Sequence, residues 1–371
     1  MSTGLRVAYT LEQCWHDVPG GTAIAALEVH RRLLHRSREI GDIEVVAVAG
    51  RHRRPPVESY RPHGDVRMWP IARPWLYESW NRLDRPSVES ATGAVDVCHS
   101  TVAIPAPSAA PSVVTVHDVA FVRTPERFTR HGVRVMRRGL DRCRDAERVI
   151  CPSRATADEL IELGFDPGRI RVVPWGVERR AVQPADRARV SRRYSLPSTF
   201  VLFVGTVEPR KNLGRLVAAM RALPDVPLVL AGASGWGDGL PAQLADHLPD
   251  PVSGARVLPL GFVPADDLRP IIELASVVAY PSLEEGFGLP ILEAMAHGTP
   301  VVTSNRSSMV EVAGGAAVLA DPHDVDSIAE AVRVALDDRD RWAQRGLERA
   351  ASCSWERTVE STIDVYREVV R

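Results

Sequence analysis

The sequence predicts an α/β protein with two doubly wound domains, each built on a parallel sheet that helices cover on both faces. Short apolar, β-branched runs alternate with helix-length stretches along the chain, which is the pattern of parallel sheets. This series restarts near residue 200. At 371 residues the chain is also too long for one ordinary hydrophobic core and suits two domains.

The N-terminal domain is expected to span residues 1–180. Its apolar runs predict helices at 22–35 and 154–163, and strands at 6–9, 44–48, 113–116, 148–151 and 171–173. Proline-rich segments at 51–56 and 104–111 are expected to be surface loops.

The C-terminal domain is expected to span residues 190–353, after a linker within 174–197 that is rich in Arg, Pro and Ala. Its predicted helices lie at 213–223, 289–296 and 325–336, and its predicted strands at 200–204, 227–231, 256–259, 276–280, 300–303 and 316–319. The last helix, within 354–371, follows another helix with no strand between them. We therefore expect it to cross back and pack on the N-terminal domain.

The composition indicates a soluble globular protein, with 45% apolar and 25% charged residues. A net charge of −1 argues against general nucleic-acid binding. The five cysteines are scattered, with neither metal-ligand nor disulfide spacing, so we expect reduced thiols in a cytoplasmic protein. No apolar run has the length of a membrane span, and no secretory signal pattern opens the chain.

Charge is distributed unevenly between the halves. Residues 1–180 hold 27 arginines against 22 acidic residues, about +5, whereas residues 181–371 carry about −6. The basic half includes a helix-like stretch with Arg134, Arg137, Arg138, Arg142 and Arg144. Peripheral contact with the anionic inner face of a membrane would fit this pattern, and so would ordinary solvation of a helix face.

The segment 280–300 has the strongest chemical pattern: an apolar strand, a loop with two glycines, and a helix. The amides of Phe287, Gly288 and Leu289 at the helix N-terminus predict an anion site. Glu285 and Glu293 flank it, and carboxylates suit sugar hydroxyls better than phosphates. A hexose hydroxyl at Glu285 and a ribose diol at Glu293 would use both, whereas a capping glutamate and a solvent-facing one would be the structural alternative.

Lys211 is the only lysine among 46 cationic residues. It follows a predicted strand in the segment Gly-Thr-Val-Glu-Pro-Arg-Lys-Asn-Leu, residues 205–213. A GC-rich coding sequence would explain the general preference for arginine. A lysine retained in a strand-to-helix turn also suits a phosphate, which a compact ammonium binds as a point charge. Cations at a helix N-terminus are unfavourable on their own, so Arg210 and Lys211 together favour a bound anion.

These residues resemble the retaining GT4 glycosyltransferases, whose GT-B fold has two Rossmann-like domains facing a cleft. Glu285 and Glu293 match the E-x7-E signature, and residues 205–213 are most similar to the bacterial mannosyltransferase branch. The resemblance covers nearly the whole chain and the order of its elements. It implies retaining transfer of a hexose from a nucleotide sugar, with GDP-mannose favoured and no cofactor or metal required.

The resemblance also implies roles for single residues. Lys211 fits the lysine that holds the donor diphosphate, and Thr206 stands where the family usually has an arginine. Arg210 is then expected to supply the second cation. Glu285 positions the sugar and Glu293 holds the ribose. The resemblance implies an acceptor hydroxyl in polysaccharide, glycolipid or glycoconjugate biosynthesis. The sequence does not name that acceptor, and a growing polysaccharide, a lipid-linked intermediate and a small metabolite all remain open.

In the N-terminal domain, Gly20 and Gly21 lie between the first strand and the first helix and resemble the family's glycine loop near the donor phosphate. They lack the G-x-G-x-x-G spacing of a dehydrogenase. His117 ends the strand 113–116, at the sheet edge where ligands bind. The family places a histidine there beside the donor sugar. Asp118 is expected to orient it or to cap the following turn.

Weaker signals complete the predicted site. Ser153 is a plausible helix N-cap and Arg154 could reach the cleft, while segments 232–235 and 261–263 are expected to line the nucleotide pocket. Asp324 and Asp326 form a D-x-D pattern typical of metal-dependent transferases. They open a helix, however, so Asp324 is interpreted as its cap and Asp326 as an acidic residue of its first turn.

Two other functions remain open at this point. A sugar-nucleotide epimerase can share the fold, although the GT4-type E-x7-E segment argues against it. A non-catalytic sugar-nucleotide-binding protein would need the same pocket without transfer.

Overall fold

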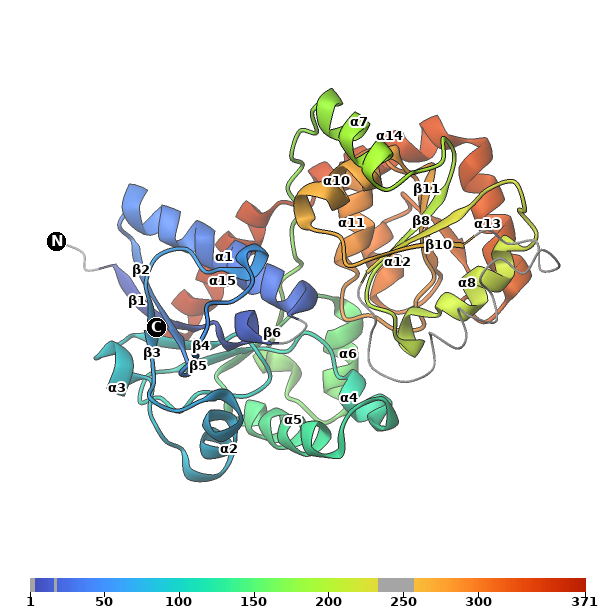
Figure 1. The fold of residues 1–371 in the computed structure, drawn as a ribbon. Coiled ribbons are helices and arrows are strands. Elements are labelled where there is room, and N and C mark those ends of the chain that lie inside the picture. Colours follow the sequence, from blue (N-terminus) through green and yellow to red (C-terminus); the bar gives the residue numbers. More distant parts are fainter. Residues whose placement is uncertain (1–3, 17–18, 233–256) are drawn as a thin grey trace. The chain divides into compact units, whose positions relative to one another are not determined.

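A computed structural model describes residues 4–16, 19–232 and 257–371 (Figure 1). The chain forms two compact units. The N-terminal unit comprises Met1–Trp175 together with Trp355–Arg371, and the C-terminal unit comprises Gly176–Ser354.

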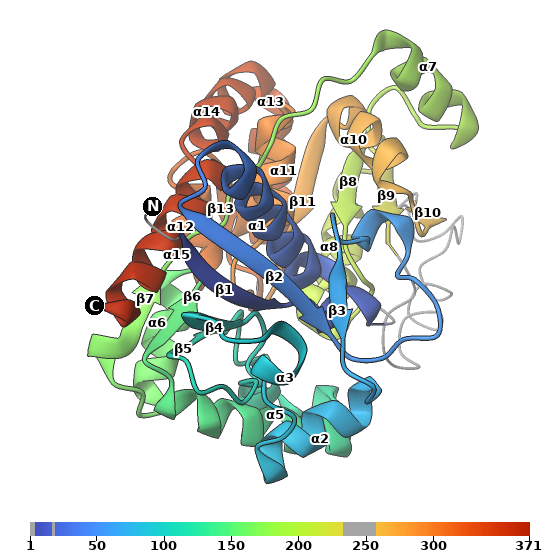
Figure 2. The ribbon, with the colours of Figure 1, turned by 90° about the vertical axis from the view of Figure 1, so that its left-hand side faces the viewer.

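The N-terminal unit contains a seven-stranded sheet with the order β3-β2-β1-β4-β5-β6-β7, and every pairing is parallel. This is the doubly wound order, in which the sequence of strands reverses between β1 and β4. Figure 2 shows β3, β2 and β1 as successive strands, with helix α1 beside β2. The strands are β1 Leu5–Thr10, β2 Ile43–Ala49, β3 Val66–Met68, β4 Val97–Ser100, β5 Ser112–Thr115, β6 Arg148–Cys151 and β7 Ile170–Val172.

Strands β3 and β4 were not predicted from the sequence. Strand β3 is a short, largely exposed edge strand, so it lacks an apolar run. Strand β4 is fully buried in the centre of the sheet but contains His99 and Ser100, which hide its apolar character. The polar ring is tolerated because both nitrogens have partners: His99 Nδ1 lies 2.6 Å from the Tyr366 hydroxyl, and Nε2 lies 2.8 Å from Thr115 Oγ1.

The final helix packs on the N-terminal unit, against α1, β4 and β5 (Figure 1). Besides the bond between Tyr366 and His99, Arg32 Nε donates to Glu356 Oε1 at 2.8 Å. The helices of this unit are α1 Gly20–Glu39, α2 Arg73–Leu83, α3 Glu89–Thr92, α4 Ala120–Arg123, α5 Arg130–Arg142, α6 Arg154–Glu162 and α15 Trp355–Val370.

The C-terminal unit contains a six-stranded parallel sheet with the order β10-β9-β8-β11-β12-β13. It repeats the doubly wound order, and here the reversal lies between β8 and β11. Its core joins the apolar faces of β8, α8 and α13. The strands are β8 Val201–Val204, β9 Leu228–Ala231, β10 Val257–Gly261, β11 Val277–Tyr280, β12 Val301–Ser304 and β13 Val318–Ala320.

A helix occupies part of the segment 174–197, which was wrongly predicted to be only a linker. Helix α7, Pro184–Arg193, is strongly polar and therefore has no conspicuous apolar stripe. It is held by the buried Asp267 of α10, which accepts hydrogen bonds from Arg193 at 3.0 Å and from Tyr194 at 2.7 Å. The other helices are α8 Leu213–Met220, α10 Ala265–Leu274, α11 Leu289–Ala296, α12 Ser308–Ala313, α13 Val325–Asp337 and α14 Arg339–Ala351.

Two expectations from composition can be compared with the structure. All five cysteines are free thiols, and four of them are buried. Within the described ranges, none of the helices has the length and apolar character needed to cross a bilayer.

Candidate active site

The loops after β8 and β11 carry the two strongest sequence motifs. These strands are neighbours and mark the reversal of strand order in the C-terminal unit. In open α/β sheets, ligands bind beside the carboxyl ends of the strands at such a point. The topology therefore brings residues 205–212 and 281–288 together, although about 70 residues separate them in the chain.

The loop after β8 depends on two glycines whose backbones touch. Gly205 has a φ of +150°, and a Cβ added to Gly232, after β9, would lie only 1.8 Å from the Gly205 carbonyl oxygen. Beyond Gly205, a 3₁₀ turn at Pro209–Lys211 ends at Asn212, whose φ is +59°. Asn212 Nδ2 donates to Pro281 O at 3.0 Å and fixes this loop to the one after β11.

The loop after β11 is held from the other side by two serines that precede or begin α12. Ser307 Oγ and Ser308 Oγ donate to the Glu285 carbonyl at 3.1 and 2.7 Å, and Ser308 Oγ also lies 3.0 Å from Phe287 O. Gly288, with φ +103°, then leads into α11. The side chains of Phe287 and Leu289 are buried, so only their backbone groups can serve a ligand.

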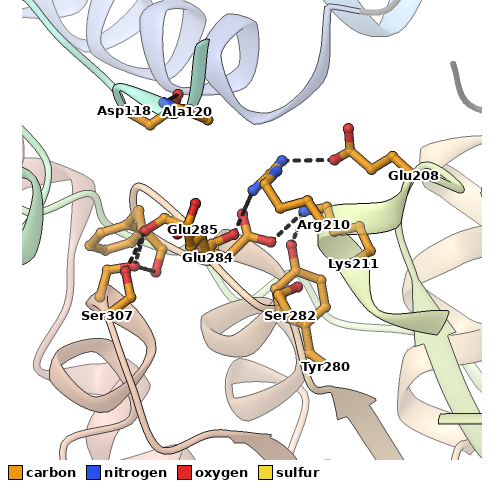
Figure 3. A network of polar contacts seen from close by, with 12 residues as sticks. Asp118, Ala120, Glu208, Arg210, Lys211, Tyr280, Ser282, Glu284, Glu285 and Ser307 are labelled. Carbon is orange, nitrogen blue, oxygen red and sulfur yellow. Dashed lines mark hydrogen bonds and ion pairs between the residues drawn. The ribbon is translucent and has the colours of Figure 1, made fainter. Parts of the chain in front are cut away.

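Three of the predicted site residues form one cluster (Figure 3). Lys211 Nζ donates to Glu285 Oε1 at 2.7 Å, and Arg210 Nη1 donates to Glu285 Oε2 at 2.5 Å. Lys211 also donates to the hydroxyl of Tyr280. Arg210 Nη2 donates to Glu208 Oε1 at 2.7 Å. Glu285 thus bridges the two cations through its two carboxylate oxygens.

The buried surroundings fix the charge of this cluster. Burial opposes ionisation of Glu285, but the charges of Arg210 and Lys211 outweigh it and hold the pKa of the carboxyl at about 2. Burial lowers the pKa of the Lys211 ammonium, while Glu285 opposes that shift. Burial also raises the pKa of Tyr280 well above its usual range. At neutral pH, Glu285 is therefore a carboxylate and Tyr280 a neutral phenol.

Glu293 and Thr206 lie outside this cluster. Glu293 is on α11, and burial raises the pKa of its carboxyl above the usual value, with partial opposition from the charge of Arg269. Among the described residues, none forms a hydrogen bond or ion pair with the Glu293 carboxylate. Thr206 lies half-buried in the loop after β8 and makes no hydrogen bond to Arg210, Lys211 or Glu285.

In the N-terminal unit, His117 follows β5 and is held in one tautomer. Its Nε2 lies 2.8 Å from the carbonyl oxygen of Thr101, which can only accept, so Nε2 carries the proton. Nδ1 is buried and has no hydrogen-bond partner among the described residues. Burial lowers the pKa of His117, so the ring is neutral at pH 7 and presents Nδ1 as an acceptor.

Trp175 connects the predicted glycine loop with this histidine. Its ring centroid lies 5.3 Å from that of His117, and a Cβ added to Gly21 would lie 3.8 Å from the indole. Gly20, with φ +62°, begins α1. Trp175 was not predicted, because a single aromatic residue after a strand gives no signal of its own.

The weaker predictions have mixed outcomes. Asp118 Oδ1 accepts from Ala120 N at 3.0 Å and therefore caps the next turn. Ser153 caps α6 by accepting from Thr156 N at 3.1 Å, and Asp324 caps α13 by accepting from Asp326 N at 2.9 Å. The predicted caps at Ser153 and Asp324 are confirmed.

The other predicted positions contribute less to the described site. Arg154 is exposed at the start of α6. Gly232 lies beside Gly205, whereas residues 233–235 of the same predicted segment lie outside the described residues. Gly261 ends β10 with φ +67°, and the side chain of Phe262 is exposed.

The sequence missed the residues that support the cluster. Tyr280, Glu208, Ser307 and Ser308 contact it through single hydroxyl or carboxylate groups. Glu208 lies within the predicted motif and carries a usable signal, since a carboxylate two residues before Arg210 can pair with it. The two serines are about 20 residues from Glu285, and only the return of the chain through β12 brings them close.

Family comparison agrees with this geometry. A model described as "Glycosyl transferases group 1" matches residues 186–349, and one described as "Glycosyltransferase Family 4" matches residues 19–180. O-antigen chain mannosyltransferase B of Escherichia coli is 36% identical over 273 residues, covering 69% of this chain and 70% of that protein. The chain therefore belongs to the group 1, family 4 glycosyltransferases, as its motifs predicted.

Other relatives match a smaller share of their length. D-inositol 3-phosphate glycosyltransferase of Salinispora tropica is 38% identical over 252 residues, which cover 61% of this chain and 52% of that one. The enzyme of the same name from Nocardioides is 35% identical, with 60% and 54% covered. The chain spans about half the length of these two relatives.

Solved structures with low sequence identity show the same fold. Sucrose-phosphate synthase of Thermosynechococcus elongatus has a TM-score of 0.75 at 22% identity, with 98% of both chains covered. Anabaena HepE in complex with UDP-glucose has a TM-score of 0.73 at 17% identity, with 98% and 100% covered. Together with the two doubly wound sheets, these likenesses confirm the predicted GT-B fold class.

Proposed function

We propose that this glycosyltransferase is a retaining hexosyltransferase that transfers mannose from GDP-mannose to a carbohydrate or lipid-linked acceptor. The single observation that supports the proposal most is the cluster of Lys211, Arg210 and Glu285 at the strand-order reversal of the C-terminal unit. Such a site suits a ligand that is both a phosphate and a sugar, because cations and a carboxylate lie side by side.

The proposed mechanism stabilises the leaving diphosphate. Negative charge develops there as the bond to the sugar breaks, so cations positioned in advance lower the barrier. Lys211 has three donors, of which Glu285 and Tyr280 take two. The third is available to a phosphate oxygen, together with backbone amides before α11.

Arg210 is held by Glu208, by Glu285 and by the carbonyl of Glu284, so a phosphate is expected to take the place of one of these partners. Its contact with Glu208 is the more exposed, since the Glu208 side chain is 25% exposed and that of Glu285 only 8%. The Glu208 pair is therefore the more hydrated of the two and the easier to exchange. We therefore infer that a donor phosphate displaces Glu208 and leaves the bond to Glu285 intact.

The sugar and the ribose are assigned to the remaining predicted residues. Glu285, kept ionised by its two cations, accepts from a hexose hydroxyl, and Glu293 accepts from the ribose. In the N-terminal unit, the neutral His117 accepts from a sugar hydroxyl through Nδ1. No side chain forms a covalent intermediate in this proposal. A donor phosphate oxygen takes the acceptor proton on the face from which the diphosphate leaves, which preserves the anomeric configuration.

The choice of GDP-mannose rests on the likeness of residues 205–213 to mannosyltransferases and on the name of the Escherichia coli relative. The complex of Anabaena HepE makes UDP-glucose the main competitor. A thermal-shift and hydrolysis screen of GDP-, UDP-, ADP- and TDP-sugars tests the choice. We expect GDP-mannose to give the largest shift, and a clear preference for a UDP-sugar would refute this donor.

We further propose that the N-terminal unit meets the anionic inner face of a membrane through α5, where Arg134, Arg137 and Arg138 are exposed. Arg142 and Arg144 contribute less, because Asp84 and the carbonyl of Leu163 bind them. Co-sedimentation should be strong with vesicles containing phosphatidylglycerol and weak with phosphatidylcholine alone. Equal binding to both vesicles would contradict this proposal.

The epimerase alternative and the purely regulatory alternative make different predictions. With donor alone, an epimerase interconverts free sugar nucleotides, a transferase slowly hydrolyses its donor, and a regulatory protein does neither. The E-x7-E spacing of Glu285 and Glu293 favours the transferase over the epimerase.

A further inference from the structure

The N-terminal unit has an open groove of about 330 Å³, and none of the predicted site residues lines it. Its lining residues come from two segments, the turn after β1 and the loop between β2 and β3, and from Val66 and Met68 of β3 itself. Both segments follow the carboxyl ends of parallel strands, which is the sheet edge where α/β proteins bind ligands. The volume is within the range of small-molecule sites.

Positive charge dominates this groove. Arg53, Arg54 and Arg61 line it, with Asp65 as the only carboxylate among the lining residues. The guanidinium groups of Arg53 and Arg54 form no hydrogen bond or ion pair with another described residue. Arg61 has only a loose contact of 3.5 Å with the exposed Glu58. Three arginines line this groove, and two of them, Arg53 and Arg54, have no side-chain partner among the described residues. They suit an anionic group, which two arginines can bind through paired N–H donors.

One wall of the groove is aromatic and held in place. The rings of Trp15 and His52 stack with centroids 4.7 Å apart and planes within 9°. Trp15 Nε1 donates to the carbonyl of Arg54 at 3.2 Å, which ties the wall to the basic loop. His52 Nε2 lies 3.0 Å from Oε1 of the buried Glu12. An amphipathic aromatic wall beside unpaired arginines fits a saccharide that carries a negative charge.

The strand order gives the separation, across the sheet, between the strands beside this groove and the strand that leads to His117. Strand β5, which precedes His117, is separated from β1 by two strand spacings and from β2 by three. Strand β3, which also lines the groove, is four spacings away. At about 4.8 Å per spacing, the separations across the sheet are roughly 10, 14 and 19 Å. A ligand that occupies the groove and also reaches His117 must therefore be longer than one sugar ring.

We propose that this groove binds an anionic group, phosphate or carboxylate, on an extended saccharide acceptor, at least two strand spacings, about 10 Å, from His117. The assignment rests on the proposed transferase function, because that function makes the ligand an acceptor. Within it, the groove names the acceptor class: an anionic oligosaccharide or saccharide–lipid, rather than a neutral or single-ring sugar.

Arginine protection in the full chain without donor tests the anion site directly. The probes are trisaccharides of mannose and of glucose that carry a terminal phosphate, a terminal carboxylate or no charge. A dicarbonyl reagent modifies exposed arginines, and mass spectrometry reads each position. We expect a charged trisaccharide to slow modification of Arg53 and Arg54 about tenfold, in line with one or two charge-assisted hydrogen bonds. Arg51, exposed and outside the groove, should react at an unchanged rate.

A pair of matched variants adds a functional readout. Arg53→Gln combined with Arg54→Gln should raise the KM for a charged trisaccharide about tenfold and leave donor hydrolysis unchanged. Arg51→Gln should change neither. Stronger binding of the phosphate or of the carboxylate probe identifies which anion the groove prefers. Equal binding of charged and neutral trisaccharides, or equal transfer to a single-ring sugar phosphate, would overturn the assignment.

Failure of this proposal and failure of the transferase function give different results. Charge-dependent protection of Arg53 and Arg54 without hydrolysis of any sugar nucleotide would support the anion site and refute the transferase function. A chain that transfers equally well to neutral acceptors, with no protection, keeps the transferase and loses the anion site.

Discussion

At the scale of single residues, the site depends on one buried ion cluster. Glu285 holds both Lys211 and Arg210, and its pKa of about 2 keeps it charged throughout the physiological range. Breaking one partner of a buried pair typically costs about 3–5 kcal/mol of stability. Deletion of Lys211 would therefore confuse loss of folding with loss of catalysis, and a variant that retains the charge is more informative.

The variant Lys211→Arg tests whether the site needs a lysine or whether any cation would serve at this position. The longer, planar guanidinium keeps a positive charge beside Glu285 but cannot reproduce the compact ammonium contact with Tyr280. We therefore expect kcat to fall about 100-fold, with a smaller loss of stability than removal of the side chain would cause. Arg221→Lys, at the end of α8 and exposed, should leave kcat unchanged and serves as the control. Wild-type activity in Lys211→Arg would show that coding bias alone explains the single lysine.

Glu293→Gln should stabilise the unliganded protein and weaken nucleotide binding. Burial raises the pKa of Glu293 in the folded state, so the folded protein binds a proton more tightly than the unfolded chain. As the pH rises from the pKa of the unfolded chain through the raised pKa of the folded protein, ionisation of Glu293 therefore lowers the free energy of unfolding. We expect the variant to gain roughly 0.5–2 kcal/mol at pH 7, and this gain to disappear below about pH 4.

Two measurements check this prediction. Denaturant unfolding at pH 7 and at pH 4 gives the stability difference, and calorimetry gives the affinity for GDP and UDP. A variant that is no more stable at pH 7 would contradict the raised pKa of Glu293. A variant that binds both nucleotides as tightly as the wild type would contradict the assignment of Glu293 to the ribose.

At the scale of elements, two loops fixed to each other shape the site. The loop after β8 approaches Gly232 so closely that a side chain has no space there, and Asn212 joins it to the loop after β11. Ser307 and Ser308, around the start of α12, hold the second loop through backbone carbonyls. The geometry of the cluster therefore depends on four segments: the two loops, the end of β9 and the start of α12.

Gly232→Ala tests this close approach, with Gly214→Ala as its control. A Cβ at Gly232 would overlap the Gly205 carbonyl oxygen, so the loop must shift, and we expect at least a tenfold loss of donor affinity. Gly214 lies in α8 with no atom within 4 Å of an added Cβ. Alanine there should stabilise the helix by about 0.5–1 kcal/mol without affecting donor binding. Unchanged donor affinity in Gly232→Ala would contradict the packing described here.

The elements also show what sequence reasoning can and cannot supply. Strong local patterns were sufficient for eleven strands and for the loops with Lys211 and Glu285, because apolar runs and glycines act over a few residues. Strand β4 was not predicted because the partners that allow His99 to be buried lie on other elements, β5 and α15. Helix α7 escaped because its stabilising contact is to Asp267 on another helix.

At the scale of the whole molecule, one strand order occurs twice. In each unit the order reverses beside the first strand, and in the C-terminal unit this reversal carries the predicted diphosphate site. The chain also returns at its end to the unit where it began, with Tyr366 bonded to His99. The sequence predicts two such units because its alternation of apolar runs and helix-length stretches restarts near residue 200. Contacts between distant residues, such as that of Trp175 with His117, were seen only in the structure.

The anomeric configuration of the first product released from GDP-mannose tests the proposed function most directly. Proton NMR of the purified chain with GDP-α-mannose should show α-mannose before mutarotation, with water as the acceptor, and this release should be about 100-fold slower in Lys211→Arg. Initial release of β-mannose would contradict retention. Release at an unchanged rate in Lys211→Arg would contradict the role of the cluster around Glu285.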